Sequence, residues 1–246
     1  MKPEVIARLK HSPLIEVMLR VDFKLPSVMT EEKAMEFGRK DLASFDFLQS
    51  LKNIQVIDIA PTSQPLKLPP RWAGSRFKND NVVITIGAHA IGISILNGYE
   101  CWEDLLRRAN PLVEAFRVFT GATGIQKVSV RSVNRIIIEE GVRIGDYLAN
   151  MPSTVEGVDT IDINEFSYRD VIHDKESDAW VVTNKVLQRV KSFEKAVVLD
   201  IEVFKLARKS VLLDSGEALT CLRGLKDAAF KGSLNKEYFD RCSYAD

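Results

Sequence analysis

Hydrophobic and polar residues alternate along several stretches of the chain, as they do in β-strands with one buried face. The clearest stretch is "KVSVRSVNRIIIE", residues 127–139, where an apolar row alternates with a row that contains two arginines. Further β-prone runs are found at 12–26, 54–60, 82–96, 158–172, 179–190 and 195–206. Short gaps between the last three runs favour an antiparallel meander.

Apolar residues spaced three and four positions apart predict helices between these groups of strands. The clearest helix covers 99–121, with Pro111 inside it and Gly121 as its stop; a second covers 214–230 behind the capping pair Asp214 and Glu217. Residues 30–51 form a weaker candidate helix. Four of the nine prolines lie within 61–81, which predicts a loop or an edge segment.

The order of these elements predicts the fold class. Strands come in groups, and a helix follows or interrupts each group, which indicates an α+β fold of mostly antiparallel sheet with two main amphipathic helices. We expect two similar α+β lobes, 1–140 and 141–246, with a single domain as the alternative.

Charge and composition narrow the functional classes. Lysine and arginine number 34, as do aspartate and glutamate, so no global field favours DNA, RNA or an anionic membrane. We found no signal peptide and no apolar window of membrane-spanning length, so we expect a cytoplasmic protein without membrane association. Three scattered cysteines and three scattered histidines predict no disulfide, metal site or cofactor.

The run at 127–139 divides into two faces, because side chains alternate along a strand. We expect one row to face the core and the other, basic row to face outward: Val128, Val130, Ser132, Asn134, Ile136 and Ile138 against Lys127, Ser129, Arg131, Val133, Arg135 and Ile137. A buried Asn134 needs hydrogen-bond partners, which we expect in a loop backbone.

Arg131 and Arg135 allow two interpretations. The favoured one pairs them with Asp200 and Glu202, which share one row of the strand "VVLDIEVF". The alternative is an anion site, since the guanidinium fork fits phosphate or carboxylate.

A second candidate binding segment is "PPRWAGSRFKND", residues 69–80, which we interpret as an exposed loop. Its cations alternate with aromatic residues, a combination that suits single-stranded nucleic acid or a protein partner: Arg71, Trp72, Arg76, Phe77 and Lys78. The alternative is an ordinary surface loop anchored by its aromatic side chains.

Signatures of catalysis are missing from the sequence. It contains no Walker-type phosphate loop, no dinucleotide-binding glycine motif and no G-x-S-x-G motif. Acidic pairs such as Asp159/Asp162 and Asp200/Glu202 suit magnesium or acid–base chemistry, but a solvated strand face is the more common explanation of such pairs. We therefore predict no catalytic residue and no metal ligand.

Four segments resemble a sporadically distributed prokaryotic family of uncharacterised proteins. They are "PLIEVMLRVDF", "GYECWEDLL", "VSVRSVNRI" and "VVLDIEVF", and the matching positions are Pro13, Leu14, Glu16, Trp102, Arg131, Asn134 and Arg135. The chain departs from the family where Ser132 and Val133 replace an aromatic position. The family has no assigned activity, and its patchy occurrence resembles that of genes on defence islands.

Three functional hypotheses follow. The leading one is a non-catalytic binding or accessory subunit that acts through a protein partner or as a homo-oligomer, in a prokaryotic defence or stress system. The second is a nucleic-acid-contacting subunit that uses Lys127, Arg131, Arg135 and the segment 71–78. The third is a metal-dependent enzyme that relies on carboxylates; it is the least expected.

Overall fold

The computed structural model describes residues 12–53, 56–57, 66–67, 69–150, 165–191, 194–207 and 215–242. The described strands are β1 (Leu14–Lys24), β2 (Asp46–Asn53), β3 (Val56–Ile57), β4 (Leu66–Lys67), β5 (Arg71–Asn79), β6 (Val82–Gly87), β7 (Ala90–Leu96), β8 (Gly124–Ile138), β9 (Ser167–Asp174), β10 (Ala179–Lys191) and β11 (Glu194–Leu206). The described helices are α1 (Glu31–Asp41), α2 (Trp102–Thr120), α3 (Ser215–Ser233) and α4 (Lys236–Cys242), with a 3-10 turn at Ile144–Asp146.

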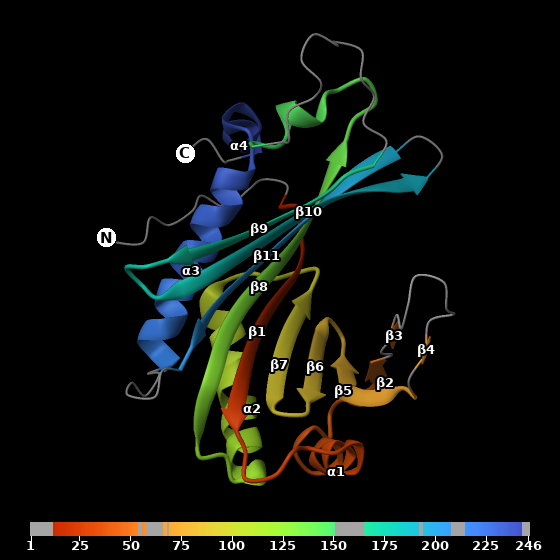
Figure 1. The fold of residues 1–246 in the computed structure, drawn as a ribbon, viewed down its shortest axis with the longest axis vertical. Helices are drawn as coiled ribbons and strands as arrows, with labels where there is room; N and C mark the ends of the chain where they lie inside the picture. Colours follow the sequence, from red (N-terminus) through yellow and green to blue (C-terminus); the bar gives the residue numbers. More distant parts are fainter. Residues whose placement is uncertain are drawn as a thin grey trace. The chain divides into compact units, whose positions relative to one another are not determined.

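Nine of these strands form one antiparallel sheet, so the expected α+β class is confirmed (Figure 1). Its strand order is β2-β5-β6-β7-β1-β8-β11-β10-β9, and β3 pairs with β4 separately. None of the helices in the described ranges combines the length and the apolar character that crossing a membrane requires.

Contacts within the chain define two compact units. Unit 1 holds the described residues of 1–17, 128–206 and 213–246, and unit 2 holds those of 18–127 and 207–212. The division therefore falls inside β1 and β8, whereas the sequence suggested residue 140. A pattern read along the chain cannot anticipate units assembled from separate segments.

The core of unit 2 lies between its strands and the helices α1 and α2. Phe37 of α1 and Phe23 of β1 both contact Phe116 of α2, each with ring centroids 5.7 Å apart. Phe77, Ile84 and Ile93 lie side by side across β5, β6 and β7 and are buried. The buried residues of α2 include Leu105, Ala109 and Phe116, which lie on the apolar face that predicted this helix.

The termini of α2 agree with the sequence prediction. Gly121 adopts a left-handed conformation with φ of 64°, and its N–H closes the helix onto the carbonyls of Arg117 and Val118. The helix runs through Pro111 without a break in its assignment.

The predicted helix at 30–51 was only partly correct. Thr30 caps α1 by accepting a hydrogen bond from the N–H of Lys33, but the helix ends at Asp41 and the second half of the segment forms β2. The apolar residues Phe47 and Leu51 fit a helical spacing, yet pairing of their main chain with β5 fixes them in a strand.

The core of unit 1 lies between α3 and the strands β10 and β11 (Figure 1). The predicted meander is confirmed, since β9, β10 and β11 pair antiparallel in sequence order. The β11 side chains that face this core are fully buried: Val197, Leu199, Ile201 and Val203. Asp214, the expected capping residue of α3, lies outside the described residues.

Candidate functional site

Arg131 on the outer row of β8 forms an ion pair with Asp200, as the favoured interpretation of the sequence predicted. Arg131 donates two hydrogen bonds to Asp200 on the neighbouring strand β11, from Nε to Oδ1 at 2.7 Å and from Nη2 to Oδ2 at 2.9 Å. This hydrogen bonding raises the pKa of Arg131, and the negative charges of Glu16 and Glu202 add to the effect. The guanidinium fork is therefore already filled by a carboxylate of the same chain.

Asn134 lies on the opposite side of β8 and is 3% exposed. Its Nδ2 donates to the carbonyl of Leu199 at 3.3 Å, so its partner is the backbone of strand β11 and not the loop backbone that we expected. The guanidinium of Arg135 is at the exposed surface, while the Arg135 N–H donates to Pro13 O at 2.7 Å. The predicted core row of β8 is buried from Val128 to Ile138, but the predicted outer row is exposed only in part: Arg135 and Ile137 are exposed, whereas Ser129 and Val133 are buried as well.

The pair between Arg131 and Asp200 begins a polar row across the sheet of unit 1. Asp200 lies opposite Asn184 on β10, and Asn184 lies opposite Arg169 on β9. Residues on this face point away from α3, because the alternate β11 residues fill the core beneath the helix. The row thus places a neutral amide between Asp200 and Arg169, and the Arg131–Asp200 pair is expected to contribute about 0.2–1 kcal/mol.

The segment 71–78 is not a loop. It forms most of β5, which pairs with β2 on one side and β6 on the other. Asn79 pairs with Val82, and Asp80 adopts φ of 48° in the tight turn between them. This "NDN" turn was the missed signal, since it marks a hairpin that the nearby prolines obscured.

Because this segment is a strand, its aromatic and basic side chains differ in burial and do not form one exposed surface. Phe77 is 3% exposed and contacts Phe47, with ring centroids 5.8 Å apart, so it serves the core. Trp72 is half-buried and its Nε1 donates to Ser75 Oγ at 3.2 Å. Arg71 is exposed, and Arg76 is half-buried. The proposed exposed aromatic–basic loop therefore does not exist in this form.

Lys127 is half-buried on the outer row of β8 and belongs to unit 2, whereas Arg131 and Arg135 belong to unit 1. Arg131 and Asn134 thus bind adjacent residues of β11, Asp200 and Leu199. It assigns the residues 71–77 to unit 2.

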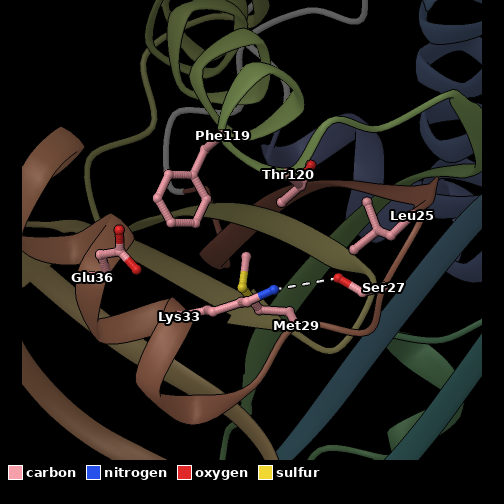
Figure 2. A pocket seen from close by; sticks show the side chains of 7 residues that line it. All are labelled: Leu25, Ser27, Met29, Lys33, Glu36, Phe119 and Thr120. Carbon is pink, nitrogen blue, oxygen red and sulfur yellow. Dashed lines mark hydrogen bonds between the residues drawn. The ribbon is translucent and has the colours of Figure 1, made fainter.

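A small pocket lies beside α1 in unit 2, and sequence reasoning missed it (Figure 2). It has a volume of about 240 Å³ and is lined by Leu25, Ser27, Met29, Lys33, Glu36, Phe119 and Thr120. We call it the α1 pocket. Its residues come from three separate segments, so no local pattern could have revealed it.

Strand β9 exposes an apolar pair that the sequence analysis also passed over. Val171 is 52% exposed and Ile172 is 58% exposed. In the same unit, the rings of His173, Trp180 and Phe204 stack across β9, β10 and β11, with centroid distances of 4.5 Å and 6.4 Å. The signal in the sequence was the two β-branched residues between charges in "RDVIHD".

Metal ligands do not cluster in the part of the chain that the structure describes. No group of three or more His, Cys, Asp or Glu side chains is placed there to hold an ion. Asp200, one member of a candidate acidic pair, is bound to Arg131. The other pair, Asp159 and Asp162, lies outside the described residues.

Comparison with known proteins gives no relative from which a function can be transferred. No protein-family model matches the sequence, and no curated protein matches it. The resemblance to a sporadically distributed prokaryotic family therefore stays a prediction.

Proposed function

We propose that this chain is a non-catalytic binding protein that receives an extended segment of a protein partner along β9. The observation that carries the proposal is the exposure of Val171 and Ile172, each more than half exposed. Neighbouring residues of a strand point to opposite faces, so β9 offers one exposed apolar side chain on each face. Among the described strands, β9 ends the sheet order and has β10 as its one neighbour.

An edge strand of this kind is suited to strand addition. The partner's main chain would bond to the outer N–H and C=O groups of β9, and its alternate side chains would supply specificity. Covering the exposed parts of Val171 and Ile172 would contribute on the order of 1 kcal/mol for each side chain. Of the residues that protect exposed strand edges, β9 lacks lysine and proline but carries Arg169, Asp170 and Asp174, so a partner strand has to match these charges.

The charges of β9 favour a different protein over a second copy of this chain. In a two-fold antiparallel pair within one sheet, opposed residues point to the same face, so their numbers are both odd or both even. Pairing centred on Ile172 sets Asp170 opposite Asp174 of the second copy. Pairing centred on Asp170 sets that carboxylate opposite itself. Both arrangements are repulsive.

When two copies pair with Val171 at the centre, Arg169 lies opposite His173 of the second copy. No acidic residue then neutralises the charge of Arg169. A heterologous segment has no such constraint. It can place an acid opposite Arg169, a base opposite Asp170 and apolar residues opposite Val171 and Ile172.

The proposal is tested by photo-crosslinking in the native host, followed by binding measurements. A photoreactive amino acid at position 172 is compared with one at Ile137, which is 47% exposed on the inner strand β8. We expect position 172 to capture one protein through an extended segment, which is identified by mass spectrometry. The captured protein is then purified and titrated against the wild-type chain, Ile172→Lys and Ile137→Lys.

We expect Ile172→Lys to weaken this binding about tenfold or more, since a charge and a long side chain replace the apolar contact. Ile137→Lys should bind as the wild type does. Crosslinks only to the same chain, or equal losses in both variants, would remove the proposal.

The two alternatives have less support. A nucleic-acid surface would need free guanidinium groups and exposed rings, but Arg131 is held by Asp200 and Phe77 is buried. A carboxylate metal site has no described cluster to supply it. The place in a defence or stress system stays a prediction from the resemblance.

A further inference from the structure

The α1 pocket holds two opposite charges that do not neutralise each other. Lys33 and Glu36 are three residues apart on α1, a spacing at which side chains can form an ion pair. Instead, the Nζ of Lys33 donates to Ser27 Oγ at 3.3 Å, on the opposite wall (Figure 2). Among the described residues, none forms an ion pair with Glu36.

The remaining walls of the pocket are apolar or carry hydroxyl groups. Met29 lines the pocket and is 3% exposed, so it adds a small apolar area to the wall. Leu25 and the ring of Phe119 add further apolar surface. Thr120 donates its hydroxyl hydrogen to Phe116 O at 2.7 Å, so its oxygen is left as an acceptor.

We propose that the α1 pocket binds a zwitterion of amino-acid size that has an apolar side chain. The ligand's carboxylate lies against the ammonium of Lys33 and the hydroxyl of Ser27. Its ammonium lies against the carboxylate of Glu36, and its side chain packs on Phe119 and Met29. Lys33 and Glu36 are both exposed; Lys33 thereby adds a carboxylate partner to its bond with Ser27, and Glu36 gains an ionic partner that the described chain does not supply.

Size and charge both favour this class of ligand. A volume of about 240 Å³ is below the range typical for drug-sized ligands, which excludes nucleotides and larger cofactors from full enclosure. A simple anion would pair with Lys33 but leave Glu36 without an ionic partner, and a simple cation would do the reverse. Only a ligand with both charges fits both groups. The inference is independent of the partner proposed for β9, which belongs to unit 1.

The test uses three matched ligands and the full chain labelled with ¹⁵N. L-leucine carries both charges, 4-methylpentanoate lacks the ammonium, and 3-methylbutylamine lacks the carboxylate. Each is titrated to about 10 mM, a range that detects even weak binding. We expect L-leucine to shift the amide resonances of residues 25–36 and 119–120, and the two analogues to bind about tenfold more weakly.

Substitutions on α1 distinguish the effect of the charges that line the pocket from the effect of a change in net charge. Lys33→Gln and Glu36→Gln should each weaken L-leucine binding about tenfold. Arg39→Gln and Glu32→Gln remove exposed charges of α1 that do not line the pocket, and they should leave binding unchanged. No shift with L-leucine, equal binding of either analogue, or equal effects of all four variants would overturn the proposal.

Discussion

At the scale of the residue, the pair Arg131–Asp200 shows how a charged residue is accommodated in a strand with one buried face. The arginine was the most conspicuous feature of the sequence, and its type and spacing were compatible with a ligand site. Its bidentate contact with Asp200 makes it a connector between β8 and β11. Sequence identified the partner correctly, because β11 alternates between buried and less buried residues and Asp200 stands on its polar row.

We predict a measurable coupling between these two side chains. Arg131→Met and Asp200→Asn should each lower the free energy of unfolding by about 1 kcal/mol, and the double variant by less than their sum. The effects are modest because 40% of the Arg131 side chain is exposed to water. Urea unfolding of the four proteins in a double-mutant cycle measures the coupling. Strict additivity would show that the pair contributes nothing.

Lys185 is a second residue whose environment the sequence did not disclose. It is 2% exposed, on the side of β10 that faces the core, and its Nζ donates to Ala149 O at 2.8 Å. Burial lowers the pKa of Lys185, because the charged form loses water, and the negative charge of Asp170 opposes this shift only in part.

The lowered pKa predicts the sign of a pH effect. Between the folded-state pKa of Lys185 and its ordinary value of 10.5, the unfolded chain binds more protons at this residue than the folded chain. The contribution of Lys185 to stability therefore rises as pH increases through that window. Relative to Lys185→Met, the wild type should gain stability on approaching pH 10.5, measured by urea unfolding at several pH values. A difference independent of pH would contradict the prediction.

At the scale of the element, sequence was reliable where one pattern could be satisfied locally. The core row of β8, the helix α2 with its glycine stop, and the meander β9–β11 were all anticipated. The failures were β2, expected to be the end of a helix, and β5, expected to be a loop. β2 depends on pairing with β5, and β5 pairs with both β2 and β6. Neither segment alone contains the information for this pairing.

Gly38 illustrates the same limit within α1. In sequence it only weakens a candidate helix, since glycine has poor helix propensity. In the structure, a Cβ at this position would come within 2.4 Å of the Phe77 ring, so the glycine permits α1 to pack closely on β5. The tertiary contact explains a residue that local propensity could only penalise.

This contact predicts opposite effects for two glycine substitutions. Gly38→Ala should lower the free energy of unfolding by about 1–3 kcal/mol, because overpacking against buried Phe77 exceeds the gain in helix propensity. Gly224→Ala in α3 meets open space and should raise it by about 0.5–1 kcal/mol. Thermal or urea unfolding of both variants provides the comparison. Stabilisation by Gly38→Ala would show that Phe77 moves aside freely.

At the scale of the whole molecule, the sequence suggested two lobes, but the assembly of each unit from separate segments and the α1 pocket were beyond the reach of sequence reasoning. Both are assembled from segments that are far apart in the chain, and no residue type marks the points of contact. The charge balance and the lack of recognised catalytic motifs are properties of the sequence itself. Those features narrow the functional classes, but the surface on which a partner would bind emerges only when the strand order is known.

The strand order predicts a pattern of amide hydrogen exchange across the molecule. Amides of β6, β7 and β11 are bonded within the sheet and covered by buried side chains, so they should exchange slowly. Amides of β9 that point away from β10 should exchange faster by orders of magnitude, since a strand edge gives its outer N–H groups to water. Exchange measured by mass spectrometry or NMR on the isolated chain tests this contrast.

The same measurement bears on the proposed function. The outer amides of β9 alternate with those bonded to β10, so strand addition should protect every second amide of β9. On adding the partner identified by crosslinking, these amides should become slow while those of β6 and β7 remain unchanged. If they are already slow in the isolated chain, another part of the same chain covers this edge. The partner would then have to displace that segment, and the exposure of Val171 and Ile172 would no longer indicate an open binding site.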